Sequence, residues 1–285
     1  MSITHKESFM KYVFGSCAAL CIVCVALICW FLVSGGLPAI LEIGPANFLF
    51  SPVWKPSQNE YGILSMIAGT FCLGAGAILL GGVLGILCAL YLVYYCPKRL
   101  YGPFKSGIGL LAGIPSIVYG FFGLVVLVPL LMKIFPGTSG KGILCASILL
   151  GIMILPTVVS VSESALQKVD RSYYEASLAV GASHERSVFL VCLPAARSGI
   201  IASIVLGLGR AIGETMAVVM VAGNAALFPD SLLSPVRTLT SNIVLEMSYA
   251  SGLHRQALIA TALVLFVLIM AINFCFALAK KKEAS

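Results

Sequence analysis

Two opposite charges, Arg210 and Glu214, stand in the middle of an apolar segment, residues 198–222. If this segment is one membrane helix, the two side chains lie four residues apart on one face, with Arg210 at its midpoint. A charge at the bilayer centre costs roughly 2.5–3.5 kcal/mol, and such residues usually face the protein interior and serve a function. The guanidinium suits paired hydrogen bonds to an oxyanion, and Glu214 can accept a proton or hydrogen bond from an oxyanion that is still protonated. The alternative interpretation is an internal ion pair that neutralises both charges.

A polar segment, residues 163–197, precedes the charged one. Ser172 followed by Glu175 predicts a capping box that opens a short helix. Gly181 stands where a helix C-terminus needs a positive φ, and Ser183 can cap a second helix. The pattern therefore predicts a helix–turn–helix with an apolar face for a partner, formed by Tyr173, Tyr174, Leu178 and Val180. The alternative is a solvated linker.

The rest of the chain has the composition of a membrane protein. Of 285 residues, 60% are hydrophobic and only 10% are charged, and the mean hydropathy is +1.04. A helix needs about 20 apolar residues to cross a bilayer, and only helices or closed barrels satisfy their backbone groups there. Because no alternating strand pattern is present, we expect one all-α membrane domain over residues 1–285. The six expected spans are 12–34, 64–95, 107–132, 142–162, 198–222 and 256–279.

Lysine and arginine residues orient these spans. They gather before the first span, after the second, in the polar segment and at the end of the chain. Positive residues collect in cytoplasmic loops, so both termini are expected inside. The net charge of +7 is explained by a basic membrane-facing rim without any nucleic acid. Most of the ten cysteines lie in apolar spans, where Cys acts as a small hydrophobe, and no disulfide is expected.

Prolines mark expected irregularities. The segment 35–61 contains four prolines and predicts an extended external loop. Pro115 opens the third span, and a proline in a membrane helix frees a carbonyl group that another donor must satisfy. Ser116 is the candidate donor, and a kink there would line a pathway. The alternative is that this kink, and the similar one at Pro156, is purely architectural.

The polar segment resembles the EAA loop of ABC-importer permeases. Glu175-Ala176-Ser177, three residues, Gly181, nine residues and Val191-Cys192-Leu193-Pro194 follow the pattern E-A-A-x3-G-x9-I-x-L-P, with Ser177 and Val191 as mild departures. The resemblance implies a coupling helix that docks into a cytoplasmic ATPase. It assigns that coupling role to Glu175, Ala176 and Gly181.

Further motifs are similar to phosphate-specific ABC permeases of the PstC type over roughly residues 61–280. They are Gly209-Arg210-Ala211-Ile212-Gly213-Glu214-Thr215-Met216-Ala217-Val218, Ala112 to Gly120, and Met153-Ile154-Leu155-Pro156-Thr157. The resemblance implies a type I importer architecture in a bacterial inner membrane and a phosphate pathway that includes Arg210, Glu214, Thr215 and Ser116. The implied partners are a second phosphate permease, two copies of an ABC ATPase and an external phosphate-binding protein.

The chain contains no G-x-x-x-x-G-K-[ST] loop to cradle a nucleotide phosphate. ATP and magnesium are therefore expected on the partner ATPase, and this chain is expected to hold no cofactor and no catalytic residue. His5, His184 and His254 are scattered without metal-ligand spacing, so no metal site is expected.

Several alternatives remain open at this point. The cargo can be another oxyanion, such as molybdate, sulfate or phosphonate, and the chain can be the sister PstA-type permease, which shares the R-A-x-G-E-T core. An ion-coupled secondary transporter would need repeats with broken helices at matching positions. That class leaves the capped cytoplasmic loop unexplained. A membrane-embedded enzyme is the weakest alternative.

Overall fold

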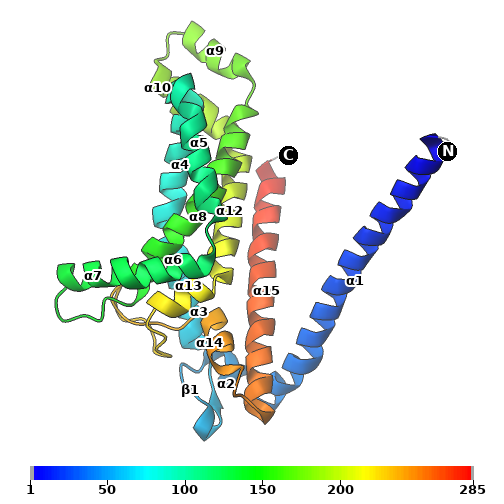
Figure 1. Cartoon of the computed structure of the whole chain (residues 1–285), viewed down its shortest axis with the longest axis vertical. Helices are drawn as coiled ribbons and strands as arrows, with labels where there is room; N and C mark the ends of the chain where they lie inside the picture. Colours follow the sequence, from blue (N-terminus) through cyan, green and yellow to red (C-terminus); the bar gives the residue numbers. More distant parts are fainter. Residues whose placement is uncertain (1–2, 284–285) are drawn as a thin grey trace.

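Most of the long apolar helices run side by side along one axis, and short elements cover the two ends of this bundle (Figure 1). The N-terminal helix meets the bundle at one end and diverges from it along its length (Figure 1). The computed structural model describes residues 3–283, with side chains over residues 10–278. We call the end that carries helices α9 (Arg171–Ala179) and α10 (His184–Ser187) the loop end. The end that carries strands β1 (Trp54–Lys55) and β2 (Glu60–Tyr61) is the hairpin end. The start of helix α1 (Ile3–Ile43) and the end of helix α15 (Gly252–Glu283) both point toward the loop end (Figure 1).

The first half of the chain supplies the β-hairpin and the helices up to residue 134. Its elements are α1 (Ile3–Ile43), α2 (Pro45–Phe50), β1 (Trp54–Lys55), the 3₁₀ turn η1 (Pro56–Gln58), β2 (Glu60–Tyr61), α3 (Leu64–Ala77), the π-helical turn η2 (Ile78–Gly82), α4 (Val83–Leu90), the π turn η3 (Tyr91–Tyr95), α5 (Lys98–Gly113), α6 (Ser116–Phe122), the π turn η4 (Gly123–Leu127) and α7 (Val128–Ile134). The two strands pair antiparallel, with Trp54 opposite Tyr61.

The second half supplies the central helix and the charged segments. Its elements are α8 (Ile143–Gln167), α9 (Arg171–Ala179), α10 (His184–Ser187), the π turn η5 (Val188–Cys192), α11 (Leu193–Ala195), α12 (Arg197–Gly213), α13 (Met216–Val221), α14 (Leu239–Glu246) and α15 (Gly252–Glu283).

Helix α8 is the centre of the main core. Leu149, Met153, Ile154 and Val158 are all buried, and they pack with residues of α3, α12 and α13. Small residues allow this packing: a Cβ on Gly81 would come within 2.7 Å of Gly151 Cα. Glycines at helix crossings let membrane helices approach closely. Two smaller cores complete the bundle, one around Phe48 at the hairpin end and one around Leu166 at the loop end.

The expected helical spans are largely confirmed. Five helical segments of the described chain are long and apolar enough to cross a membrane: Met10–Ile43, Leu64–Tyr95, Ser116–Ile134, Ile143–Gln167 and Gly252–Leu278. A sixth is available if His184–Ala195 and Arg197–Gly213, which meet at a bend of 70°, act as one span. The fold class is therefore an all-α membrane bundle.

Two expected continuous spans are broken, and these expectations were wrong. The span at 107–132 is divided at Ile114–Pro115, where both residues have extended backbones, ψ 126° and 143°. The residue before a proline avoids the helical region, so Pro115 ends α5 instead of kinking it. Helices α6 and α7 then run across the long axis of the bundle (Figure 1). The span at 198–222 is divided at Glu214–Thr215, between α12 and α13.

The expected extended loop over residues 35–61 is also only partly present. Helix α1 continues through Pro38 to Ile43, and Pro45 occupies the first turn of α2. A proline there loses no helical hydrogen bond, because the first N–H groups have no partner in the helix. Helix α1 packs on α15 through Gly36, where a Cβ would lie 3.0 Å from Ala260 Cα.

Candidate functional site

Arg210 lies in the last turn of α12, directly before the break in the helix. It is half-buried, and its Nη1 donates a hydrogen bond to Thr157 Oγ1 of α8 at 3.2 Å. Within the described residues this is the one hydrogen bond of the guanidinium, and no carboxylate pairs with it. The remaining N–H donors of the guanidinium fork are available for a ligand.

Glu214 is not on the same helical face as Arg210, which corrects the expectation of four-residue spacing in one helix. Helix α12 ends at Gly213, and Glu214 has an extended backbone, φ −71° and ψ 131°. Its Oε1 accepts from the Ala217 N–H at 3.2 Å, so it caps the start of α13. Its carbonyl oxygen accepts from Thr240 Oγ1 at 3.1 Å. The internal ion pair that the sequence leaves open is therefore absent from the described residues.

Thr215 and Ser116 lie at the two breaks. The Thr215 hydroxyl donates to the Gly213 carbonyl at 3.3 Å, which closes the turn between α12 and α13. Ser116 is the first residue of α6 and is half-buried. The breaks are neighbours because α6 packs on α13, where a Cβ on Gly120 would meet Ala217 Cα at 2.9 Å. Broken helices at membrane depth are tolerated where the protein or a cavity satisfies the freed backbone groups.

The polar segment forms the expected helix–turn–helix, α9 followed by α10. Gly181 has a φ of +86°. The Gly181 N–H donates to the Leu178 carbonyl at 2.9 Å, and the Ala182 N–H to the Ser177 carbonyl at 3.2 Å. These two bonds form a Schellman motif, which terminates α9. The Ser183 side chain accepts from the Arg186 N–H at 3.4 Å and caps α10, as expected.

The expected capping box at Ser172 is wrong, because the cap lies two residues earlier. Asp170 Oδ1 accepts from the Ser172 N–H at 2.9 Å, and this hydrogen bond lowers the pKa of the Asp170 carboxyl. Glu175 instead pairs with Arg171 at 2.8 Å, one turn back on the same exposed helix face. Ala176 and the side chains of Tyr173, Leu178 and Val180 are also exposed. An exposed apolar face rimmed by charge is typical of a docking surface.

Contacts beneath α9 fix its position on the bundle. Tyr174 and His184 share a hydrogen bond of 2.7 Å between Oη and Nδ1. The His184 ring lies edge-on to Tyr95 of η3, with the centroids 4.7 Å apart. These contacts join α9 to α10 and to the loop end of the α3–η3 column.

Three groups of functional interest are not predicted from the sequence. The first is Thr157, which the sequence does not identify as the hydrogen-bond partner of Arg210. At the loop end, Glu163 is 4% exposed and pairs with Lys105 at 3.0 Å, with Tyr101 and Gln167 as further donors. A short polar side chain after Pro156 gives a local signal for Thr157. Lys105 and Glu163 are far apart in the sequence, so no local pattern predicts that they form a pair.

The third group joins the elements of the hairpin end. The buried Glu246 carboxylate accepts from Arg237 Nη1 at 2.6 Å and from Trp54 Nε1 at 2.9 Å, and lies 2.8 Å from His254 Nε2. Burial alone raises the pKa of Glu246, but hydrogen bonds from Trp54, His254 and Arg237 outweigh it and leave the pKa lowered. The network ties β1, α14 and α15 together.

Comparison with known proteins places this geometry in a family. Residues 81–282 match the model of the binding-protein-dependent transport system inner membrane component. The chain belongs to this family. A phosphate transport system permease protein PstC of Mesorhizobium japonicum is 37% identical, with 83% of this chain and 78% of the relative covered. The PstC protein of Haemophilus influenzae is 34% identical, with 93% and 90% covered.

A solved structure shows the same fold. The chain matches an inward-facing MetNI methionine ABC transporter with a TM-score of 0.59 at 20% identity, over 81% of this chain and 99% of the other. At this identity the likeness concerns the fold alone, which is that of an importer permease. This permease is an inner membrane component of an ABC transporter. The EAA-like motif of its sequence lies in the helix–turn–helix, and the motif that contains Arg210 and Glu214 lies at the break between α12 and α13.

Proposed function

We propose that this permease carries inorganic phosphate in an ATP-driven importer, and that the Arg210 guanidinium contacts the anion at the break between α12 and α13. The observation that carries the proposal is the single hydrogen bond of Arg210 to Thr157, with no carboxylate partner among the described residues. A half-buried guanidinium with free donors is suited to bidentate contact with an oxyanion. The names of the two PstC relatives support phosphate as the cargo.

Glu214 has two roles in this proposal. It holds the break by capping α13, and its second carboxylate oxygen can accept a hydrogen bond from a phosphate that is still protonated. Sulfate and molybdate are fully deprotonated at neutral pH and offer no such donor. This difference favours phosphate over these alternatives. Thr215 and Ser116 line the two breaks through which the ion passes.

The helix–turn–helix is the proposed contact with the ATPase. Its exposed apolar residues, with Glu175 and Ala176 beside them, dock into a groove of a cytoplasmic ABC ATPase, of which the complex holds two copies that bind ATP and magnesium. The loop end is then cytoplasmic, which places both termini inside. A sister permease completes the pathway, and an external binding protein delivers phosphate to the hairpin end.

Uptake by the assembled complex tests this function. The permease is expressed with its sister permease, ATPase and binding protein, and labelled-phosphate uptake is measured against unlabelled competitors. We expect competition by phosphate and none by a tenfold excess of sulfate or molybdate. A complex lacking only this permease is the control and should not take up phosphate. Uptake of sulfate or molybdate in place of phosphate would contradict the proposed cargo.

A further inference from the structure

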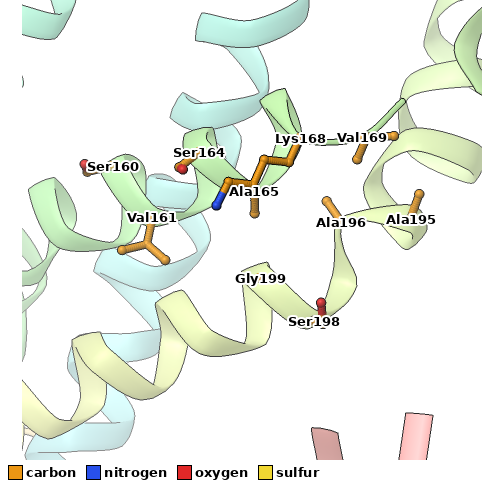
Figure 2. Close-up of a pocket in the computed structure, with 10 residues that line it drawn as sticks. All are labelled: Ser160, Val161, Ser164, Ala165, Lys168, Val169, Ala195, Ala196, Ser198 and Gly199. Atoms are coloured by element: carbon orange, nitrogen blue, oxygen red, sulfur yellow. The ribbon is translucent and has the colours of Figure 1, made fainter. Parts of the chain in front are cut away.

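A cavity lined by both polar and apolar residues opens at the loop end between α8 and α12 (Figure 2). Its volume is about 560 Å³. Its lining includes Ser160, Ser164 and Lys168 from α8 and its C-terminal cap, and Ser198 and Gly199 from α12. The lining thus offers three hydroxyl groups and one ammonium group, and it contains no carboxylate from the described residues.

Lys168 is the charged group of the cavity. Its side chain runs back along α8 toward Ser164 (Figure 2), as expected from the tilt of helical side chains toward the N-terminus. The nearby Glu163 is buried and already pairs with Lys105, and Asp170 caps α9. Within the described residues, the Lys168 ammonium makes no hydrogen bond or ion pair. The positive charge is therefore left for a ligand or for solvent.

A row of polar side chains joins this cavity to Arg210. Thr157, Ser160, Ser164 and Lys168 follow each other at spacings of three, four and four residues, so they share one face of α8. Eleven residues of helix rise about 16 Å. The first member, Thr157, accepts the hydrogen bond from Arg210. The row thus leads from the broken helix to the loop end.

Helix α12 packs closely on α8 beside this row. Ser162 Oγ donates to Ser203 Oγ at 2.8 Å, and a Cβ on Gly199 would overlap Ala165 Cβ. Both contacts lie between Arg210 and the start of α12, so the two helices run antiparallel in a fixed register. The cavity is therefore a feature of a packed helix pair rather than a gap beside a loose segment.

We propose that this cavity is a second oxyanion site, a vestibule in which Lys168 and the hydroxyls of Ser160, Ser164 and Ser198 receive a phosphate group. Lysine is a strongly hydrated point charge on a flexible stem, without the rigid fork of arginine. A lysine therefore suits a site that holds an ion briefly and then releases it. The phosphate group belongs either to the transported ion or to a phospholipid headgroup. The inference rests on the proposed function, because the row begins at Thr157, the hydrogen-bond partner of Arg210.

Protection of an introduced thiol tests the vestibule directly. Ser164→Cys is introduced into the assembled importer in lipid discs, and its reaction rate with N-ethylmaleimide is followed by mass spectrometry of the α8 peptide. The probe is inorganic phosphate, compared with chloride at equal ionic strength. At a concentration ten times the dissociation constant, phosphate should slow the reaction about tenfold. Ser160→Cys reports on the same cavity if Ser164→Cys disturbs assembly.

The same thiol reaction rate is then compared between two lysine variants and between two lipids. Adding Lys168→Gln should abolish protection, whereas Lys98→Gln, at an exposed lysine on the same end of the molecule, should leave it intact. A headgroup occupant would make the reaction slow in phosphatidylglycerol and fast in a phosphate-free galactolipid, whether or not phosphate is added. A reaction rate that is the same in the two lipids and is unchanged by added phosphate in either would overturn the vestibule.

The outcomes separate this inference from the proposed function. If phosphate protects the introduced thiol but the wild-type importer takes up no labelled phosphate, the proposed cargo is wrong and the vestibule stands. If uptake is normal and depends on Arg210 but no condition protects the thiol, the vestibule is wrong and the proposed function stands.

Discussion

At the scale of single residues, two buried carboxylates of this permease bond to partners far away in the sequence. Glu246 bonds to Trp54, which precedes it by 192 residues, and Glu163 bonds to Tyr101 and Lys105. A buried charge is stable only when it is paired and hydrogen-bonded. Each of these carboxylates therefore fixes the relative position of separate elements.

Glu246 makes the stability of the hairpin end depend on pH. Its folded pKa lies below the ordinary value of 4.5, so the folded state binds fewer protons than the unfolded state in that range. The resulting stability is present above about pH 4.5 and is lost as pH falls through the folded pKa. We expect the thermal unfolding midpoint of the purified permease to fall in this acid window, and Glu246→Gln to reduce the fall.

Glu246→Ala tests the same network at neutral pH. It leaves the Arg237 guanidinium, only 18% exposed, without its carboxylate, and breaking a buried pair in this way costs about 3–5 kcal/mol. Glu175→Ala is the control, because the Arg171–Glu175 pair is exposed and such pairs contribute about 0–1 kcal/mol. Equal thermal stability of the two variants would contradict a structural role for Glu246.

At the scale of elements, the helix–turn–helix shows how local sequence determines a surface. Caps at Asp170 and Ser183 and the Schellman turn at Gly181 set the ends of α9 and α10. A Cβ on Gly181 would meet nothing within 4 Å. The requirement for glycine is therefore one of backbone conformation alone.

Substitutions at Gly181 test whether its backbone conformation is needed for ATPase docking, because a side chain there meets no neighbour. A β-branched residue at positive φ costs about 1–2 kcal/mol, so Gly181→Val should misdirect α9 and weaken ATPase association without loss of membrane insertion. Asparagine tolerates this conformation, so Gly181→Asn should retain association. Association is measured by co-purification of the ATPase. Normal co-purification with Gly181→Val would argue against docking through this turn.

The crossing of η2 and α8 makes a second prediction at this scale. Gly81→Ala places a methyl group against the backbone of Gly151, and such overpacking costs about 1–3 kcal/mol. Gly109→Ala is the matched control, since a Cβ there meets nothing within 4 Å and alanine favours helix by up to about 1 kcal/mol. The thermal midpoint should fall for Gly81→Ala only; equal midpoints would show that the crossing tolerates a side chain.

At the scale of the whole molecule, the sequence predicts the helices better than their breaks. Spans, the polar segment and the positive φ of Gly181 follow from local patterns of hydropathy and capping. The break at Glu214–Thr215 does not, because no proline marks it and its supports, Thr240 and Thr157, lie on other segments. Pro115 signals an irregularity, but the sequence does not distinguish a kink from a complete turn into α6.

Orientation in the membrane is also a property of the whole molecule. Since positive residues favour the cytoplasm, we expect the loop end inside and the hairpin end outside. An impermeant maleimide applied to intact cells should label Lys55→Cys and leave Arg171→Cys unlabelled, as measured by mass spectrometry of each peptide. Labelling of Arg171→Cys alone would invert the topology and remove the ATPase-docking role of α9.

The most direct test of the central claim is labelled-phosphate uptake by Arg210 variants of the assembled importer, at matched expression. Loss of two charged hydrogen bonds of at least about 1.5 kcal/mol each should lower uptake by Arg210→Gln about hundredfold or more. Arg210→Lys keeps the charge but loses the fork, so its uptake should be impaired. Because Glu214 caps α13 and does not pair with Arg210, adding Glu214→Gln to Arg210→Gln should not restore uptake. Near-normal uptake by this doubly neutral variant would contradict the claim that Arg210 contacts phosphate.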